Sequence, residues 1–271
     1  MSYKLVAIDM DGTLLNSKGL VSDRTRQAIH EASKKGVYIV LATGRILKSA
    51  INHSLRLKIN KPIISCNGGI IVDENRRIIY ERPIKARAVE EVANLGFKNN
   101  IYYHFYDEDS FYSTVYIEEV LNFYNSAESK KDGSEVKINI FEDIKEVINN
   151  KINVYKFLFL DDDKEKLDSL RSRLESIEDI SVCSSWGNNV EVMDKEVSKG
   201  TSLEYLCNKL KIPAEQVIAI GDNENDISMI KYAGLGVAMD NGVESIKSVS
   251  DIITESNDED GVAKVIEKYI L

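Results

Sequence analysis

Short apolar runs alternate with amphipathic stretches along much of this 271-residue chain. Apolar residues at helical spacing predict helices at 22–35, 46–59, 201–211, 225–233 and 262–269. Runs rich in β-branched residues predict strands at 5–8, 37–42, 62–66, 217–220, 235–238 and 252–253. Ser22 is placed to cap the first helix, and Gly36 is placed to end it. Such alternation is typical of an α/β fold whose parallel sheet is covered on both faces.

The pattern changes in the middle of the chain. A helix at 87–97 precedes the segment IYYHFYDEDSFYSTVY (101–116), which predicts two aromatic strands joined by an acidic turn. A polar patch at 126–134 follows, and the segment YKFLFLDDDKEKLDSLRSRLESI (155–177) predicts a strand and a charged helix. The first of these strands carries Tyr102, Tyr103, His104 and Tyr106. These side chains could stack on a sugar or ring of a substrate, or they could form a packed face of the sheet.

This middle region predicts a separate α+β unit inserted at 84–188. The flanking segments, 1–83 and 189–271, would then build one α/β core from both ends of the chain. We expect that core to be a Rossmann-like, doubly wound parallel sheet, and the inserted unit to form a cap on it. Trp186 would lie near the junction of the two parts.

Composition narrows the class of protein. Hydrophobic residues make up 43% of the chain and charged residues 29%, which is typical of globular proteins. The net charge of −9, without a stripe of Lys and Arg, argues against nucleic-acid binding, although a single phosphate could bind in a local pocket. No apolar run is long enough to cross a membrane. The chain has three cysteines that lie far apart, Cys66, Cys183 and Cys207. Their spacing predicts reduced thiols rather than a disulfide framework or a zinc site, so we expect a cytoplasmic, unanchored protein.

Two carboxylates follow the first predicted strand in the string DMDGT. Asp9 and Asp11 are two residues apart, so an extended backbone directs both to the same face. Two carboxylates about 4 Å apart repel by roughly 4 kcal/mol at an effective dielectric of 20, so either one is protonated or a cation lies between them. A simple turn explains the same residues, because Asp-Gly is a common turn dipeptide.

Residues suited to an anion precede two other predicted helices. Thr43 and Gly44 follow the strand at 37–42, where a hydroxyl and free backbone N–H groups can bind a phosphate at the start of a helix. Lys199 directly precedes another helix, where its charge opposes the helix dipole and would suit a phosphate. The alternatives are an ordinary turn for Thr43 and Gly44 and an exposed, solvated lysine for Lys199.

The string GDNEND closes the strand at 217–220 and begins the next helix. It places Asp222 at the strand end and Asn225 and Asp226 at the helix start. In doubly wound sheets this edge is where ligands bind. A hard cation held by Asp9 and Asp222, with water and phosphate oxygens, would suit magnesium.

In these motifs the chain resembles the haloacid dehalogenase superfamily of phosphohydrolases. DMDGT is similar to the first motif of the family, ATGR to the second, Lys199 to the third and GDNEND to the fourth. SCNGG (65–69) and SNDEDGV (256–262) are similar to hallmarks of its Cof-type, sugar-phosphatase-like branch, which carries a large cap between the second and third motifs. The resemblance covers essentially the whole chain.

The resemblance implies roles for the acidic residues. Asp9 would be the nucleophile that forms an aspartyl-phosphate, and Asp11 would protonate the leaving group and later activate water. Asp9 and Asp222 would bind Mg²⁺, joined by Asp11 through its backbone carbonyl. Asp226 would hydrogen-bond to these ligands and hold them in place, or would itself be an additional contact to the metal.

It also implies a group of residues that hold phosphate oxygens, namely the Met10 backbone amide, Thr43, Gly44, Lys199 and Asn225. Arg45, beside this group, could contact the substrate or form a surface ion pair. Cys66 and Asn67 would lie on a loop that faces the cap, with Cys66 as a small buried side chain.

These observations predict a magnesium-dependent phosphatase acting on a small phosphorylated metabolite such as a sugar phosphate, with a cap that opens and closes over the site. A phosphotransferase or mutase would use the same intermediate but pass the group to a second hydroxyl. A sugar-phosphate-binding regulator without turnover is the third possibility, and the complete acid set argues against it. The motifs do not identify the substrate, the cap residues that select it, or the oligomeric state.

Overall fold

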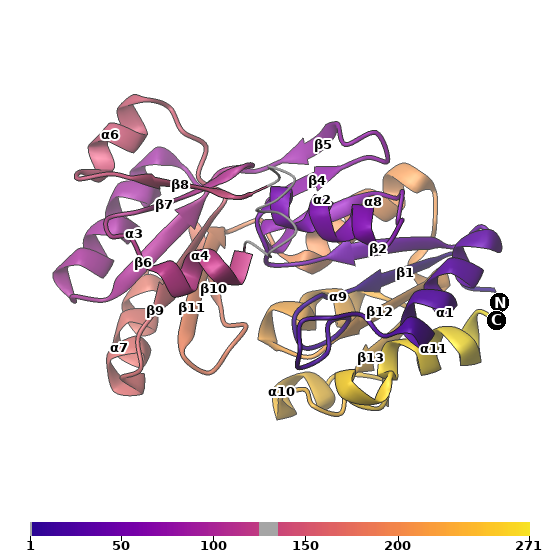
Figure 1. The fold of residues 1–271 in the computed structure, drawn as a ribbon. Coiled ribbons are helices and arrows are strands. Elements are labelled where there is room, and N and C mark those ends of the chain that lie inside the picture. Colours follow the sequence, from indigo (N-terminus) through magenta and orange to yellow (C-terminus); the bar gives the residue numbers. More distant parts are fainter. Residues whose placement is uncertain (1, 125–134) are drawn as a thin grey trace.

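The computed structural model describes residues 2–124 and 135–271, which form two β-sheets (Figure 1). The predicted polar patch at 126–134 lies outside the described residues. Both ends of the described chain belong to the larger sheet and its helices (Figure 1), and close to them the rings of Tyr3 and Tyr269 lie edge to face.

The larger sheet has eight strands in the order β14-β13-β12-β1-β2-β3-β4-β5. The strands are β1 (Leu5–Ile8), β2 (Tyr38–Ala42), β3 (Ile63–Ser65), β4 (Ile70–Val72), β5 (Ile78–Glu81), β12 (Val217–Gly221), β13 (Leu235–Ala238) and β14 (Ile252–Ile253). Neighbours from β14 to β3 are parallel, as predicted, whereas β4 and β5 add an antiparallel edge that the sequence pattern did not predict. The chain leaves β1 toward β2 and later returns on the other side of β1 at β12, which is the switch in strand order of a doubly wound sheet.

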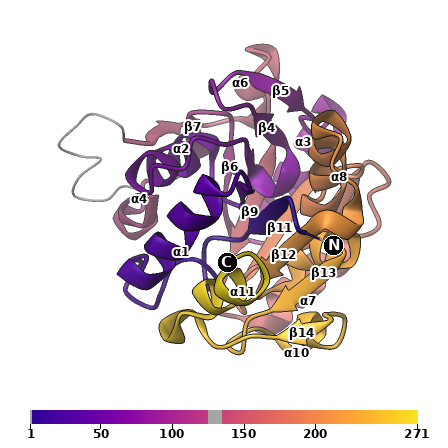
Figure 2. The ribbon, with the colours of Figure 1, turned by 90° about the vertical axis from the view of Figure 1, so that its right-hand side faces the viewer.

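Helices cover both faces of this sheet (Figure 2). One face packs against α1 (Asp23–Lys34), α2 (Leu47–Arg56) and α11 (Gly261–Tyr269), and the other against α8 (Lys199–Leu210), α9 (Ile227–Tyr232) and α10 (Glu244–Lys247). Four short 3-10 helices connect these elements: η1 (Cys66–Gly68), η2 (Ala214–Gln216), η3 (Glu224–Asp226) and η4 (Asn257–Glu259). Ser22 caps α1 as predicted, because its hydroxyl accepts a hydrogen bond from the Thr25 backbone.

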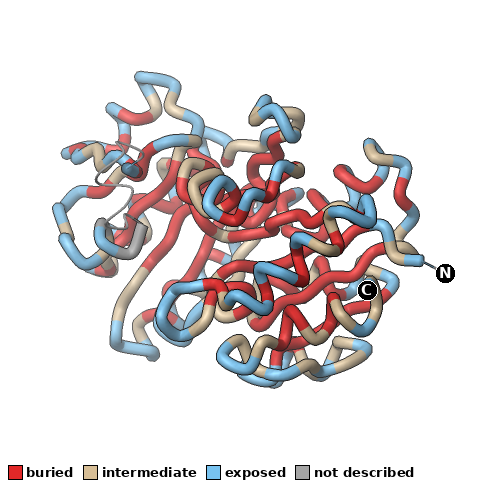
Figure 3. Tube along the Cα trace, turned by 45° about the vertical axis from the view of Figure 1, so that its right-hand side comes forward, coloured by how far each residue is buried: buried red, intermediate tan, exposed pale blue. Residues whose placement is uncertain are grey.

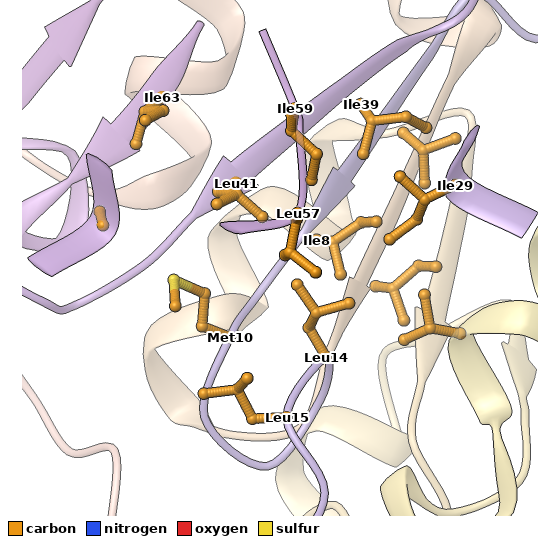
Figure 4. Packing of buried hydrophobic residues seen from close by; sticks show 14 of the residues in the cluster. Ile8, Met10, Leu14, Leu15, Ile29, Ile39, Leu41, Leu57, Ile59 and Ile63 are labelled. Carbon is orange, nitrogen blue, oxygen red and sulfur yellow. The ribbon is translucent and has the colours of Figure 1, made fainter. Parts of the chain in front are cut away.

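Alternate residues of each central strand enter opposite hydrophobic clusters. In β1, Val6 and Ile8 join the cluster beneath α1, while Leu5 and Ala7 join the cluster beneath α8. Figure 4 shows Ile8 packed among side chains from β2 and α1, with Met10 continuing the same cluster beyond the strand end. The central strands are therefore buried along their length, and exposed residues lie mainly on the outer surfaces of the helices and loops (Figure 3). This burial fixes the position of the strand ends.

The smaller sheet has six strands in the order β10-β11-β9-β6-β7-β8. The strands are β6 (Tyr102–Tyr106), β7 (Ser110–Ser113), β8 (Lys137–Ile140), β9 (Lys156–Leu160), β10 (Ile180–Cys183) and β11 (Asn189–Asp194). One face is rich in aromatic residues and packs against α3 (Ala86–Lys98), α6 (Ile144–Asn149) and α7 (Lys164–Leu174). This part also contains α4 (Glu118–Tyr124). Tyr103, on this face, is buried with Phe157 and Phe159, so a packed sheet face accounts for it.

The opposite face of the smaller sheet lies toward the larger sheet. Tyr106 of β6 and Phe111 of β7 belong to the same hydrophobic cluster as β1 and β2. β11 pairs with β9 in the smaller sheet, although its residues lie beyond the predicted end of the cap at 188. We therefore propose that the chain returns to the core after Asp194 rather than at 189. The limits of the two parts as domains stay a prediction.

Candidate active site

Two acidic residues stand at the ends of neighbouring parallel strands. Asp9 directly follows β1, and Asp222 directly follows β12. The strands pair in register, with Ile8 opposite Ile220, so both carboxylates emerge at the same edge of the sheet. Both residues are buried, with exposed fractions of 5% for Asp9 and 8% for Asp222. The strand ends thus bring together two carboxylates from opposite ends of the chain.

The turn after β1 is shaped around the Asp222 carboxylate. Gly12 has a φ of +83°, and a Cβ built on it would lie 2.4 Å from Asp222 Oδ2. Thr13 donates a 2.7 Å hydrogen bond from its hydroxyl to Asp222 Oδ1. Because any side chain at position 12 would displace this carboxylate, the Gly-Thr pair of DMDGT has a direct role in building the site.

Lys199 lies between two of the acids. Its side chain is fully buried in the first turn of α8, and its Nζ is 2.5 Å from both Asp9 Oδ1 and Asp226 Oδ1. The alternative of an exposed, solvated lysine is therefore wrong. Asp226 Oδ2 also accepts hydrogen bonds from the backbone N–H groups of Asp222 and Asn223, at 3.0 and 3.2 Å. Asp226 thus links Lys199 to the turn that carries Asp222.

Three carboxylates at this edge are close enough to share a cation. Asp9, Asp222 and Asp226 each offer an oxygen, and these oxygens lie within 4.8 Å of one another. Burial, followed by the charge of Asp226, raises the pKa of Asp9 well above its ordinary value and raises that of Asp222 to about 7. A set of buried carboxylate oxygens with no sulfur or imidazole ligand fits a hard cation such as Mg²⁺, whose charge would offset their repulsion.

The Asp11 carboxylate points to a different partner. Arg45 donates two hydrogen bonds to it, from Nε to Oδ2 at 2.7 Å and from Nη2 to Oδ1 at 2.6 Å. Burial alone would raise the pKa of Asp11, but the Arg45 guanidinium outweighs burial and holds it below its ordinary value. His53 Nε2 lies 3.0 Å from Arg45 Nη1 on the far side. The predicted ion pair of Arg45 is therefore present, but it is buried rather than on the surface, since only 8% of Arg45 is exposed.

The residues expected to hold phosphate line the same edge. Thr43 is fully buried after β2, and its hydroxyl accepts a hydrogen bond from the Arg45 backbone N–H at 3.1 Å. A Cβ on Gly44 would lie 2.8 Å from Asn67 Oδ1, and Asn225 donates to that same oxygen at 3.2 Å. Met10 is buried in the core cluster, and its carbonyl accepts from the Leu15 backbone. Their roles in binding phosphate stay a prediction.

The smaller sheet supplies a polar roof that the motifs did not predict. Lys156 of β9 and Glu191 of β11 form a buried ion pair, with Nζ 2.5 Å from Oε1. Asn67 of η1 donates to Glu191 Oε2 at 2.6 Å, so the loop expected to face the cap contacts it directly. Cys66 is buried beside it as expected, and burial raises the pKa of its thiol to about 12. The signal in the sequence was a charged residue beside apolar strand residues, namely Lys156 at the start of β9 and Glu191 between two valines of β11.

The larger sheet and the roof both line a small cavity of about 30 Å³. Asp9, Asp11 and Arg45 line it from the larger sheet, and Lys156 and Glu191 line it from the smaller sheet. Trp186 lines this cavity and a neighbouring one of about 460 Å³, which also touches Asp11 and Arg45, so its predicted place at the junction agrees with the structure. The small cavity is large enough for a water molecule and far too small for a sugar phosphate.

A second polar contact joins the two parts beside the edge that carries Asp222. Arg171 of α7 donates two hydrogen bonds to Glu224 of η3, at 2.9 and 2.5 Å. The Ser184 backbone donates to the same carboxylate at 3.1 Å, and Asn223 donates to the Ser185 carbonyl at 2.8 Å. The turn that follows Asp222 is therefore tied to the smaller sheet and its helices by α7 and by residues 184–185.

Comparison with known proteins identifies the class to which this fold and site belong. The model of the haloacid dehalogenase-like hydrolase family matches residues 6–266, so the chain belongs to that family. Phosphatase YwpJ of Bacillus subtilis is 35% identical over 99% of this chain and 100% of its own length. A second B. subtilis protein, 5-amino-6-(5-phospho-D-ribitylamino)uracil phosphatase YcsE, is also 35% identical, over 100% of this chain and 97% of its own. The resemblance to the Cof-type branch is confirmed, and the chain is a phosphatase of this superfamily.

The solved structures agree with this conclusion. A haloacid dehalogenase-like hydrolase from B. subtilis has a TM-score of 0.88 and 34% identity, and the alignment covers 99% of this chain and 100% of that one. The predicted α/β fold with a parallel-sheet core is thereby confirmed. No helix in the described part of the chain combines the length and apolar character that a membrane crossing requires.

Proposed function

We propose that this phosphatase is a magnesium-dependent phosphomonoester hydrolase that acts on a small phosphorylated sugar or polyol through an aspartyl-phosphate intermediate. The observation that carries this proposal is the convergence of Asp9, Asp222 and Asp226 at one strand edge, with Lys199 between two of them. An anionic nucleophile can attack an anionic phosphate only where positive charge offsets their repulsion. At this edge the buried ammonium of Lys199 lies beside Asp9, and the carboxylate set is suited to a divalent cation.

Asp9 is the proposed nucleophile, because its carboxylate lines the cavity and Lys199 fixes one of its oxygens. Asp9 and Asp222 would hold Mg²⁺, with the Asp11 backbone carbonyl as a further ligand. Asp226 would keep Lys199 and the Asp222 turn in place. When bound, magnesium would supply charge neutralisation and would orient the phosphate.

Asp11 is the proposed general acid and base. To protonate a leaving group it must carry a proton, which the Arg45 contact disfavours. We therefore propose that Arg45 turns from Asp11 to the substrate when the ester binds. The backbone amides of Met10 and Gly44, the Thr43 hydroxyl and Asn225 would hold phosphate oxygens around it.

The cavity of about 30 Å³ beside Asp9 is too small for a metabolite, whereas the neighbouring cavity of about 460 Å³ also touches Asp11 and Arg45. We therefore propose that an opening of the cap joins the two cavities and admits the substrate to Asp9. The relative YcsE is named for a substrate whose phosphate sits on a ribityl chain. This supports including polyol phosphates beside sugar phosphates as candidates.

A phosphate-release screen tests the proposal. Purified protein is assayed against sugar phosphates, polyol phosphates and an aryl phosphate, with Mg²⁺ and with EDTA, and substrates are ranked by kcat/KM. We expect release that requires Mg²⁺ and that is abolished in Asp9→Asn. Undiminished release in EDTA would remove the magnesium assignment.

The same screen separates the alternatives. Formation of an isomerised sugar phosphate without free phosphate would indicate a phosphotransferase or mutase. Absence of any turnover across the panel, together with tight binding of one member, would indicate a regulator that has lost catalysis.

A further inference from the structure

The roof of the cavity contains a buried ion pair that the proposed chemistry does not use. Lys156 and Glu191 are 2% and 1% exposed, yet both line the cavity that also contains Asp9 and Asp11. Burying two opposite charges often stabilises a fold no more than apolar residues of similar size would. A buried pair beside catalytic carboxylates is therefore better explained by recognition of a ligand than by stability.

The sheet geometry directs this pair at the core. Lys156 and Leu158 alternate along β9, and both line the cavity, whereas Phe157 between them packs beneath the helices of the smaller sheet. Glu191 of β11 stands opposite Leu158 on the same face. Lys156 Nζ would lie 3.0 Å from a Cβ placed on Gly44, so the ammonium reaches across the junction to the turn that follows β2.

Hydrogen bonding leaves Lys156 with donors to spare. The carboxylate of Glu191 accepts from Lys156 at 2.5 Å, Ser185 at 2.9 Å and Asn67 at 2.6 Å, so both of its oxygens are occupied. A lysine ammonium has three N–H donors. Within residues 2–124 and 135–271, the structure records one acceptor for Lys156, which is Glu191, together with the face of the Tyr106 ring at 5.3 Å. Because Lys156 lines the small cavity, its remaining N–H donors are available to a group bound there.

The direction of phosphoryl transfer indicates which part of a substrate would lie against Lys156. The attacking and leaving oxygens lie roughly in line on opposite sides of phosphorus. With Asp9 as nucleophile on the core side, the leaving group extends toward the roof. The charge of Lys156 is already balanced by Glu191, so its partner needs to be an acceptor but not a second anion.

From this geometry, and resting on the proposed function, we infer that Lys156, positioned by Glu191, donates a hydrogen bond to a hydroxyl oxygen of the leaving group. The pair would thereby select hydroxylated alkyl phosphates over esters whose leaving groups are apolar. Asn67, which contacts both Glu191 and Asn225, would connect this recognition to the phosphate-binding edge.

A matched pair of substrates tests the inference. Ribitol 5-phosphate and n-pentyl phosphate have the same number of carbons, and only the first carries hydroxyls on its leaving group. The measured quantity is the ratio of their kcat/KM values in Mg²⁺. We expect the wild type to prefer the hydroxylated ester by at least about tenfold. Lys156→Met should lower this ratio by about 10- to 100-fold, the range of one hydrogen bond to a charged group.

Three further variants keep the result interpretable. Lys156→Met combined with Glu191→Gln leaves no unpaired buried charge, and it should show the same loss of preference. Lys164→Met removes an exposed lysine of the same cap and should retain the wild-type ratio. Asn52→Leu alters the neighbouring cavity and should retain it as well.

Several outcomes would overturn the inference. An equal loss on both substrates would mean that Lys156 contacts the phosphoryl group or only supports the fold. An unchanged ratio in Lys156→Met, or loss of preference in Asn52→Leu alone, would place hydroxyl recognition elsewhere. Failure of the proposed function is distinguishable from all of these, because the wild type would then release no phosphate from either ester or from p-nitrophenyl phosphate.

Discussion

Replacing Lys199 by methionine probes the electrostatic balance of the site directly. Lys199 is fully buried and lies 2.5 Å from one oxygen of Asp9 and 2.5 Å from one oxygen of Asp226. Methionine fills a similar volume without charge. The variant therefore leaves three buried carboxylates within 4.8 Å of one another with no lysine between them.

The expected cost follows from these contacts. Unit charges about 4 Å apart interact by roughly 4 kcal/mol at an effective dielectric of 20, and Lys199 makes two such contacts. The desolvation of the lysine offsets part of this gain, and removing one partner from a buried pair typically costs about 3–5 kcal/mol. Protonation of Asp9, whose pKa is already raised by burial, limits the loss. We therefore expect Lys199→Met to lower the free energy of unfolding by about 3–5 kcal/mol at neutral pH.

Urea unfolding with and without Mg²⁺ measures this loss. Because the lysine repels a divalent cation, we expect Mg²⁺ to stabilise Lys199→Met more than it stabilises the wild type. Lys209→Met, an exposed lysine of the same helix, serves as the control and should change stability by less than about 1 kcal/mol. A loss below about 1 kcal/mol in Lys199→Met, or an equal effect of Mg²⁺ on both proteins, would refute the reasoning.

Three further perturbations address other parts of the structure. Asp222→Asn should raise the Mg²⁺ concentration for half-maximal phosphate release by at least about tenfold, and an unchanged magnesium titration would remove Asp222 as a ligand. Burial, followed by the charge of Lys156, lowers the pKa of His104 from 6.5 to about 3. Between these two pH values the unfolded chain binds a proton that the folded chain does not, so the free energy of unfolding falls as the pH falls. The stability difference between wild type and His104→Gln should therefore change by about 1.4 kcal/mol per pH unit between about pH 6 and 4, and a constant difference in urea unfolding would contradict this. Arg171→Met should speed amide hydrogen exchange at 183–186, whose backbone contacts Glu224, without speeding exchange in the central strands; unchanged exchange would show that the pair does not hold the junction.

The central sheet was largely predictable from local pattern. The predicted strands at 5–8 and 235–238 coincide with β1 and β13, because continuous apolar runs buried on both faces give an unambiguous signal. The predicted helix at 22–35 coincides with α1 and its flanking caps, since Ser22 and Gly36 mark its ends by their backbone preferences.

The edge strands and the return from the cap were not predictable in the same way. β4 and β5 follow β3 with no α-helix between them, so they lack the alternation of strand and helix from which the other strands of this sheet were predicted. β11 lies just beyond the predicted cap, and its place is decided by pairing with β9, about 30 residues earlier in the chain. A local pattern carries no information on such a partner.

The candidate site likewise contains some features that the local sequence pattern predicted and others that it did not. The convergence of Asp9, Thr43 and Asp222 was predictable, because parallel strands end at a common edge. Lys199 lies in the first turn of α8 rather than at the end of a strand of this sheet, and the family resemblance was what associated it with the other three. The partners of these residues were not predictable, and the clearest case is Arg45, whose buried contact with Asp11 depends on the path of the turn after β2. The position of Lys156 and Glu191 above the site depends on how the smaller sheet packs on the larger one. The periodicity of residues within either sheet does not specify that packing.

The central claim is that the Asp9 carboxylate receives the phosphoryl group. The most direct measurement is a rapid acid quench during turnover in Mg²⁺, followed by digestion and mass spectrometry of the peptide that contains Asp9. We predict a phosphorylated Asp9 in the wild type and neither phosphorylation nor phosphate release in Asp9→Asn. Phosphate release that continues in Asp9→Asn, with no phosphoryl group on that peptide in the wild type, would contradict the claim.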